Sequence, residues 1–260
     1  MEISIKQQLQ SWRNVIFALF LRELQGKFND KLGLGWAFIE PFVFVFVISF
    51  ARSFISGRDV HSIPLFVFMM IGLMGVQSFM TCISAVPNSF KQSKPLYAFR
   101  QVQPIAALLT AAFVEFSIKV GVIGLLALAI YLLDMDFELN DPLLLIMLFI
   151  GLWVFAVSMS LIFAVLIAFI PEMNKVKNMF NRPLFFISCV FFSLQDFPQE
   201  YWHWFTWNPL VHFLELARYA CYESYGDAGV SYQYITEVTI VTMFIGLALY
   251  HITWKKILAR

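Results

Sequence analysis

Residues 143–169 read LLLIMLFIGLWVFAVSMSLIFAVLIAF, a stretch without a single charged side chain. A helix needs about 20 mostly apolar residues to cross the hydrocarbon layer of a bilayer, so this stretch predicts a membrane-spanning helix. The rest of the chain agrees, because 60% of its 260 residues are hydrophobic and only 13% are charged. Soluble domains are about a quarter charged. The composition therefore indicates an integral membrane protein and excludes a soluble one.

Five other apolar stretches approach the same length. We predict an all-α integral membrane protein with six transmembrane helices, at 36–55, 64–84, 104–133, 143–169, 178–194 and 235–253. The fifth is the weakest, because its apolar run from Pro183 to Leu194 is too short for a full crossing. No linker or internal repeat interrupts the chain, so residues 1–260 are expected to form a single domain.

The distribution of charge predicts the orientation. The segments 1–35, 85–103, 170–182 and 254–260 contain 14 of the 18 Lys and Arg residues. Positive charge is retained on the cytoplasmic side of a membrane, so both termini are expected in the cytoplasm and the number of spans is even. The 18 basic and 17 acidic residues nearly cancel, so net charge does not indicate a nucleic-acid partner.

Residues 1–35 precede the first span and contain an amphipathic pattern. Its apolar positions recur at helical spacing, and they are Ile5, Leu9, Trp12, Ile16, Leu19 and Phe20. This pattern is typical of a helix that lies in the membrane plane, and a cytosolic helix packed on the protein's own spans would show it too. In either case the helix lies beside the cytoplasmic mouth.

The sequence offers no catalytic centre. The four histidines are scattered, and the one metal-like spacing, His212 with Glu215, is too small to make a metal site alone. There is no glycine-rich phosphate loop and no dinucleotide fingerprint, so no cofactor is expected on this chain. If ATP powers the protein, a separate subunit must bind it.

Three of the charged residues inside the predicted spans are candidates for function. Glu115 and Lys119 lie one turn apart, which suits either a proton relay or a neutralising i,i+4 pair. Glu40 has no partner nearby in the sequence. The fourth span also repeats small residues at every fourth position, which lets another helix approach closely, either from the same chain or from a second copy.

The segment 196–234 contains 12 aromatic residues. Asn208-Pro209 is a helix-start signal, and an apolar face follows it. An aromatic belt at the membrane interface is one explanation. Apolar helices in an external loop also suggest re-entrant elements, and aromatic faces would suit a sugar chain.

Two stretches resemble the type-2 ABC exporter permeases. The first is the run from Leu21 to Pro41, and the second is the run from Trp207 to Arg218 before the last span. The residues that match the first motif are Arg22, Glu23, Lys27, Phe28, Leu32, Gly33, Trp36 and Pro41. The second stretch is most similar to the capsular polysaccharide branch of the family, through Asn208, His212, Glu215 and Arg218.

The resemblance implies a permease without enzymatic activity that exports a lipid-linked capsular polysaccharide across the bacterial inner membrane. It implies a homodimer with a channel between the copies, and two ATP-binding cassette subunits that hold ATP and Mg. Periplasmic or outer-membrane export proteins are possible partners. O-antigen or teichoic-acid exporters share the general shape, and a proton-coupled carrier and a membrane-bound glycosyl or acyl transferase are rivals from other classes.

The same resemblance implies three functional regions. The cytoplasmic entrance would contain Arg22, Glu23, Lys27, Trp36 and Glu40. The loop 85–103 would couple to the ATPase through Pro87, Asn88, Lys91 and Lys94. The channel and an external gate, built from re-entrant helices between spans five and six, would contain Phe42, Phe46, Trp202, Trp204, Trp207, Asn208, His212, Glu215, Arg218 and Tyr219.

Overall fold

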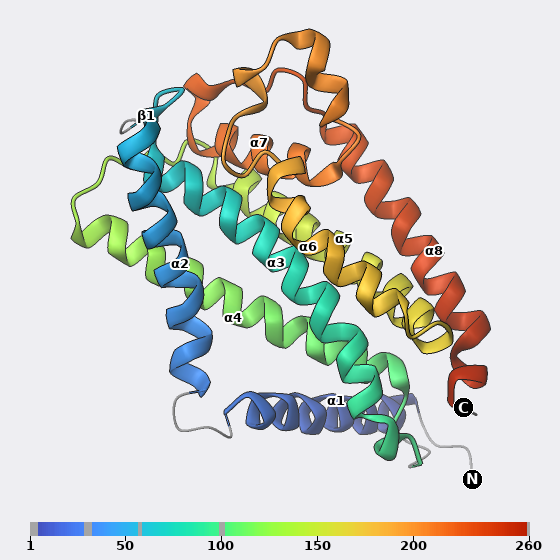
Figure 1. Ribbon diagram of the computed structural model, residues 1–260. Coiled ribbons are helices and arrows are strands. Elements are labelled where there is room, and N and C mark those ends of the chain that lie inside the picture. Colours follow the sequence, from blue (N-terminus) through green and yellow to red (C-terminus); the bar gives the residue numbers. More distant parts are fainter. Residues whose placement is uncertain (1–4, 29–32, 57–58, 99–101, 259–260) are drawn as a thin grey trace.

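The computed structural model describes residues 5–28, 33–56, 59–98 and 102–258 (Figure 1). They form an α-helical protein with one two-stranded hairpin in its described part. The long helices are α1 (Ile5–Phe28), α2 (Gly33–Ser56), α3 (Leu65–Gln92), α4 (Pro104–Leu132), α5 (Pro142–Phe169), α6 (Met173–Ile187), α7 (Pro209–Cys221) and α8 (Tyr232–Leu258). The short elements are β1 (Asp59–Val60), β2 (Ile63–Pro64), and the 3-10 helices η1 (Lys94–Ala98), η2 (Leu194–Asp196), η3 (Gln199–Trp204) and η4 (Glu223–Tyr225).

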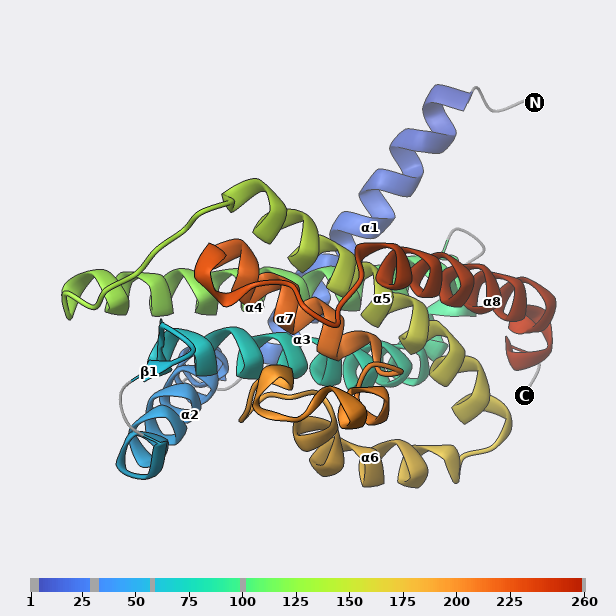
Figure 2. The same cartoon turned by 90° about the horizontal axis from the view of Figure 1, so that it is seen from above.

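Helix α3 is the centre of the bundle. Buried residues make up 72% of its most apolar window, against 17% for α2 and 11% for α8. Seen from above, α3 lies between α4 on one side and α6 on the other (Figure 2). Two large apolar clusters surround it, one shared with α5 and α7 and one shared with α2 and α4. The outer helices α2 and α8 therefore present most of their apolar surface outward.

Helix α1 lies across one end of the bundle, roughly perpendicular to the other long helices (Figure 1). Its contact with α4 centres on Leu19, which is buried with Ala106 and Ala107. We refer to this as the α1 end of the molecule and to the opposite end, where β1 and α7 lie, as the α7 end. The second half of the amphipathic pattern thus packs on α4, whereas Trp12 in the first half is 38% exposed. Leu32 of the first motif lies outside the described residues.

Five helices in the described part of the chain, α2, α3, α4, α5 and α8, are long and apolar enough to span a membrane. The predicted fifth span at 178–194 differs from what the structure has there. Helix α6 begins at Met173 and ends at Ile187, so its 15 residues are too few for a full crossing, and its first half contains Lys175 and Lys177. The chain then turns at Cys189, whose φ of 55° lies in the left-handed region. Figure 1 shows α6 running from the end of α5 back toward the α7 end.

The small residues of α5 face helices of the same chain. Ser160 and Ala156 are buried, and the Ser160 hydroxyl lies 3.5 Å from the Cys82 sulfur of α3. On α8, a side chain at Gly246 would come within 2.9 Å of the Ser158 carbonyl oxygen. Close approach of α3 and α8 to α5 therefore explains these small residues.

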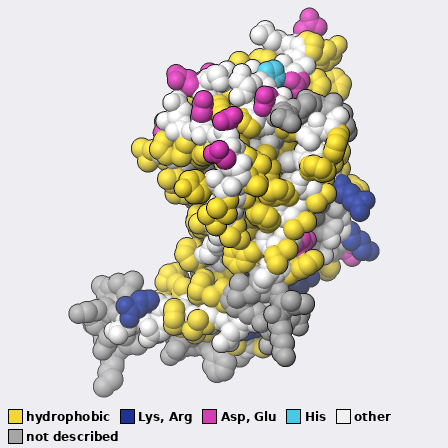
Figure 3. Space-filling model, turned by 90° about the vertical axis from the view of Figure 1, so that its left-hand side faces the viewer, with side chains coloured by type: hydrophobic (Ala, Val, Ile, Leu, Met, Phe, Trp, Pro, Cys, Tyr) yellow, Lys and Arg dark blue, Asp and Glu magenta, His cyan; other side chains and the backbone are white. Residues whose placement is uncertain are grey.

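Charge separates between the two ends. On the face shown in Figure 3, Asp and Glu side chains gather at the α7 end, and Lys and Arg side chains lie nearer the α1 end. Hydrophobic side chains occupy the surface between them. The start of α1 and the end of α8 both lie at the α1 end (Figure 1). This arrangement is the one expected for a membrane protein whose basic end is cytoplasmic.

Candidate functional site

A polar cavity lies between α1 and the last turns of α3 at the α1 end. We call it the inner cleft; its volume is about 560 Å³. It is lined by Arg22, Glu23, Gln25, Gly26, Lys27, Ala85, Asn88, Ser89 and Gln92. Arg22 Nη2 donates to the carbonyl oxygen of Gln92 at 3.2 Å, which ties the two helices together. The inner cleft thus brings three predicted entrance residues and the predicted coupling residue Asn88 into one site.

The inner cleft has two cations, Arg22 and Lys27, close to the carboxyl group of Glu23. Burial raises the pKa of the Glu23 carboxyl, and Lys27 and Arg22 lower it in part. A half-buried carboxylate is costly unless cations face it. The two nearby cations therefore favour the charged form of Glu23.

Lys27 reaches from α1 into the bundle and forms an ion pair with Glu115 of α4. The i,i+4 pair of Glu115 with Lys119 considered from the sequence is not formed. The Lys119 ammonium instead lies 3.4 Å from the Gln77 side-chain oxygen on α3. The pairing differs because α1 packs across α4 and supplies a closer cation than the helix itself does.

A second cavity, of about 460 Å³, opens on the other side of this ion pair. We call it the charged cavity; it lies among α1, α2, α3, α4 and α6. It is lined by Lys27, Ala37, Glu40, Pro41, Phe44, Gln77, Met80, Thr81, Glu115, Ile118, Lys119 and Phe185. The structure therefore places Glu40, whose partner the sequence did not reveal, beside three other charged groups.

The remaining residues predicted for the α1 end are more scattered. Trp36 is 60% exposed on α2 and lines neither cavity. Pro87 is buried inside α3, which continues to Gln92, so residues 85–92 of the predicted loop 85–103 are the end of a long helix. Lys91 and Lys94 are exposed, and Lys94 begins the short helix η1. These two cations are available to another protein at this end.

At the α7 end, Asn208 caps helix α7 as its sequence predicts. The Asn208 side-chain oxygen accepts from the Leu210 N–H at 3.1 Å. Its amide donates to the Ser188 hydroxyl at 3.0 Å and to the Ile187 carbonyl oxygen at 3.3 Å. Asn208 is buried. It therefore fixes the start of α7 to the end of α6.

Glu215 and Arg218 form the centre of a buried polar network on α7. The side chains are 3% and 0% exposed, and Arg218 Nη1 donates to Glu215 Oε1 at 2.8 Å. Arg218 Nη2 donates to the carbonyl oxygens of Cys189 and Val190 at 3.0 and 3.2 Å. The guanidinium carbon also lies 3.6 Å above the Phe68 ring of α3. One side chain thus joins α7, the turn after α6, and α3.

Both oxygens of the Glu215 carboxylate accept further hydrogen bonds. Its Oε2 accepts from the Tyr225 hydroxyl at 2.7 Å, and its Oε1 accepts from the Leu194 N–H at 3.2 Å. The Ser193 hydroxyl lies 2.6 Å from the Tyr225 hydroxyl and extends the network. Burial raises the pKa of Tyr225 well above its ordinary value, so this phenol remains a hydrogen-bond donor.

His212 is also buried and bonded on both ring nitrogens. Its Nδ1 accepts from the Ser231 N–H at 3.0 Å, and its Nε2 lies 2.7 Å from the Thr206 carbonyl oxygen. Since Nδ1 must accept, the geometry requires the neutral ring with its proton on Nε2. Burial lowers the pKa of His212, in agreement. No group of three or more His, Cys, Asp or Glu that suits a metal ion occurs in the parts of the chain that the structure describes.

The predicted aromatic residues of the α7 end divide into two groups. Trp202 is half-buried and donates to the Phe197 carbonyl oxygen at 2.9 Å, and Tyr219 is also half-buried. Trp204 and Trp207 are 65% and 62% exposed, and the Trp207 indole donates to the Trp204 carbonyl oxygen at 2.7 Å. Only the second pair offers open ring faces to a sugar or to the membrane interface.

The phenylalanines of α2 also divide by face. Phe42 and Phe46 are half-buried, and the Phe46 ring lies 4.9 Å from the Phe66 ring of α3. Phe50 and Phe54 are 66% and 77% exposed. The outward face of α2 therefore belongs to Phe50 and Phe54, whereas Phe42 and Phe46 pack toward the bundle.

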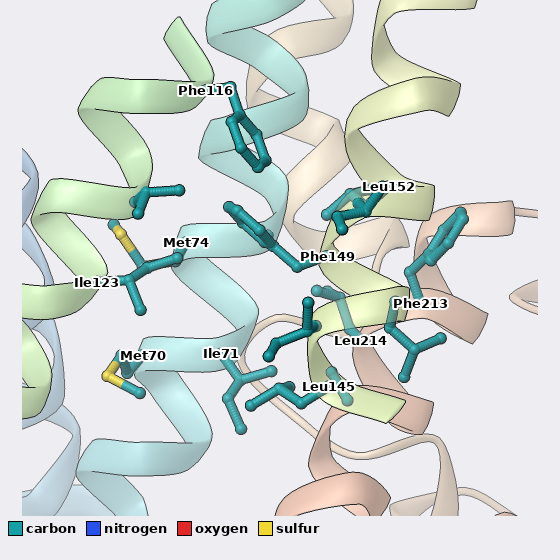
Figure 4. Close-up of a pocket in the computed structure, with 16 residues that line it drawn as sticks. Met70, Ile71, Met74, Phe116, Ile123, Leu145, Phe149, Leu152, Phe213 and Leu214 are labelled. Atoms are coloured by element: carbon teal, nitrogen blue, oxygen red, sulfur yellow. The ribbon is translucent and has the colours of Figure 1, made fainter. Parts of the chain in front are cut away.

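An apolar cavity of about 360 Å³ lies among α3, α4, α5 and α7. Figure 4 shows its lining side chains, which include Met70, Ile71, Met74, Phe116, Ile123, Leu145, Phe149, Leu152, Phe213 and Leu214. No hydrogen-bonding side chain lines it. It therefore suits hydrocarbon and not a polar sugar.

Several structurally important residues were not singled out from the sequence. They are Gln77, Ser193 and Gly72, which are ordinary residue types with no motif around them. Gly72 matters because a Cβ there would come within 2.9 Å of Arg218 Nη2 and 3.0 Å of the Val190 carbonyl oxygen. Such a contact between distant segments leaves no local pattern, so only the fold reveals it.

Comparison with known proteins places this geometry in a family. A family model described as "ABC-2 type transporter" matches residues 14–222. The chain is 36% identical over 234 residues to the polysialic acid transport protein KpsM of Escherichia coli, which covers 90% of this chain and 91% of that protein. It is 22% identical over 249 residues to the capsule polysaccharide export inner-membrane protein CtrC of Neisseria meningitidis serogroup A, which covers 94% and 93%. The similarity therefore extends over both ends of the molecule.

Proposed function

Because this chain belongs to the ABC-2 type transporter family, we propose that it is the permease subunit that exports a capsular polysaccharide across the inner membrane. The observation that carries the proposal is its similarity, over nearly the whole chain, to two transport proteins whose names specify polysialic acid transport and capsule polysaccharide export. The basic α1 end is the cytoplasmic side in this proposal, and the acidic α7 end faces outward. Helix α6 completes an even number of passes, with α7 and the 3-10 helices beside it forming a re-entrant external gate.

A separate ATP-binding cassette subunit would supply the energy and would hold ATP and Mg. The exposed Lys91 and Lys94 at the end of α3 suit a docking surface for it. Force applied there would reach α1 through the bond from Arg22 to the Gln92 carbonyl oxygen, and would reach α4 through Lys27 and Glu115. These two links support a movement in which α1, α3 and α4 shift together. The inner cleft would then open and close as the entrance for a lipid-linked polymer.

The channel is proposed to form between two copies of the chain. Helices α2 and α8 support this idea, because they are the least buried of the five long apolar helices. The buried network around Arg218 would hold α7 as a rigid external gate, and Trp204 and Trp207 would present ring faces at the exit. In this scheme Asn208, His212, Glu215 and Arg218 act by positioning the gate rather than by touching the polymer.

The rival functions have less support. A proton relay at Glu115 needs a carboxylate free to exchange its proton, and this one is already paired with Lys27. The names of the relatives favour capsule over O-antigen or teichoic acid. The proposal also includes periplasmic or outer-membrane export proteins as partners, which the family resemblance implies.

Deletion of the gene in its host tests the proposal, with the wild-type copy restored as the control. Polymer should accumulate inside the cytoplasm and disappear from the surface, as followed by fractionation and electron microscopy. Absence of polymer everywhere would indicate a role in synthesis. An unchanged surface would overturn the assignment to polysaccharide export.

A further inference from the structure

The charged cavity contains a buried cation with few partners. Lys119 is 5% exposed and lines this cavity. Among the described residues its ammonium group makes one hydrogen bond, 3.4 Å to Gln77 Oε1, and no ion pair. An ammonium group has three N–H donors, and a buried charge is costly unless it is paired. Lys119 therefore has unused donors directed at a cavity of about 460 Å³.

No carboxylate around the cavity contacts the Lys119 ammonium group within the described residues. Glu115 is occupied by Lys27, so this pair is neutral as a unit. Glu40 lines the cavity from α2 but is exposed, so its carboxylate can remain in water. In a low-dielectric site an ammonium group whose donors no carboxylate occupies attracts an anion more strongly than it would in water.

Gln77 provides a second donor beside Lys119. Its side-chain oxygen accepts from Lys119, and its amide nitrogen makes no hydrogen bond within the described part of the chain. Thr81, which also lines the cavity, is engaged with backbone carbonyl oxygens of its own helix. Lys119 and Gln77 together present N–H groups from two helices to the same space. This pairing suits the two oxygens of a carboxylate or a phosphate.

We propose that Lys119 and Gln77 form a binding site for an anionic oxygen group of the exported molecule. The inference rests on the proposed function for the identity of the cargo. A carboxylate of an acidic sugar and the phosphate of a lipid anchor share the required chemistry. The site would retain one such group inside the protein while the rest of the exported polymer moves. It would favour acidic over neutral cargo.

Calorimetric titration of the purified protein in phosphatidylcholine nanodiscs tests the inference. The probes are hexagalacturonate as an acidic sugar chain, maltohexaose as a neutral one of equal length, and short-chain phosphatidylglycerol as a lipid phosphate. At least one of the two anionic probes should bind, and its affinity should fall by at least about tenfold in Lys119→Met. The probe that responds identifies whether the sugar or the lipid supplies the group, and any binding of maltohexaose should be unchanged.

Matched variants separate this effect from a folding defect. Lys119→Arg keeps the charge and should retain binding within about threefold of wild type. Gln77→Leu should weaken anion binding without removing a charge, and Glu40→Gln should tighten it because it removes a negative charge from the cavity lining. If Lys119→Met does not fold, two other measurements test the site. Gln77→Leu should bind the anion more weakly, and high salt should weaken anion binding to the wild-type protein.

Two results would overturn the inference: neither anion binds the wild-type protein, or the variants at Lys119 and Gln77 bind as well as wild type. Its failure is distinct from failure of the proposed function. Deletion of the gene can block export even if neither anion binds here, and anion binding in nanodiscs can hold even if deletion leaves the surface unchanged.

Discussion

Arg218 Nη1 lies 2.8 Å from Glu215 Oε1 on the same face of α7, and both side chains are almost completely buried. The pair reaches beyond its own helix, because the same guanidinium donates to two carbonyl oxygens after α6 and covers the Phe68 ring. Removing one member would leave a charged partner buried without compensation, and this makes the pair the first target for mutation.

We predict that Arg218→Met destabilises the protein by about 3–5 kcal/mol, the usual effect of breaking a buried ion pair from one side. Thermal unfolding of the purified protein in detergent measures the change. Arg182→Met, at an exposed arginine of α6, is the control and should have little effect. The double variant Glu215→Gln with Arg218→Met should recover part of the loss. Equal stability of Arg218→Met and wild type would disprove the structural role.

Gly72 should be intolerant of any side chain. A Cβ there would contact Arg218 Nη2 and the Val190 carbonyl oxygen at 2.9 and 3.0 Å, and overpacking of this kind costs about 1–3 kcal/mol. Gly124 of α4 has no heavy atom within 4 Å of the same position, so Gly124→Ala should be neutral or slightly stabilising. Comparison of the two unfolding temperatures checks the prediction, and equal effects would count against it.

The link from α1 to α4 is an ion pair between Lys27 and Glu115, so it should still form when the two charges are exchanged. Lys27→Glu places two carboxylates together and should abolish surface polysaccharide, whereas the exchange Lys27→Glu with Glu115→Lys should restore a large part of it. Surface polymer is measured on intact cells, with protein amounts checked by immunoblot. Arg13→Met, at an exposed residue of α1, is the control. If the exchange fails while the protein is present at normal levels, the ion pair is not what couples the helices.

His212 predicts a pH dependence at the α7 end. Burial lowers its pKa below the ordinary value of 6.5, so the folded state binds fewer protons than the unfolded state. The resulting stability is present above pH 6.5 and is lost as the pH falls toward and through the lower folded-state pKa. Unfolding temperatures between about pH 8 and pH 5 should fall more for wild type than for His212→Gln. Parallel curves for the two proteins would refute this contribution.

In the proposed homodimer, the exposed face of α2 in one protomer should contact the same face of α2 in the other protomer. Single cysteines at Phe50 or Phe54 on this face should give oxidation-dependent products of twice the mass, because both side chains are more than half exposed. Val45→Cys, at a fully buried position, is the matched control and should give none. The three native cysteines are themselves buried. Failure of every position on the exposed face to form a dimer would move the interface elsewhere.

The sequence predicted the elements whose signals are local. Long apolar runs identified α2, α3, α4, α5 and α8, and Asn208-Pro209 identified the start of α7. The predicted span at 178–194 differed because polar residues at the start of α6 and a tight turn at Cys189 moved the helix toward the N-terminus. Hydropathy averages over a window, so it missed both effects.

The candidate site was predicted less completely, because its contacts join distant segments. Residues of the predicted entrance do meet in the inner cleft, but the partner of Glu115 comes from α1 and not from its own helix. The motif from Asn208 to Arg218 was expected at a channel surface, and the structure buries all four of its polar residues. Spacing alone shows that they share a helix face, and it does not show whether that face is open or covered.

Transport into inverted membrane vesicles tests the central claim most directly. Vesicles from the deletion strain, with and without the restored wild-type chain and its ATPase, receive lipid-linked polymer, and protection from an added polysaccharide-degrading enzyme is measured. The account predicts protected polymer only when this chain and ATP are both present. Protection without this chain, or with a proton gradient in place of ATP, would contradict it.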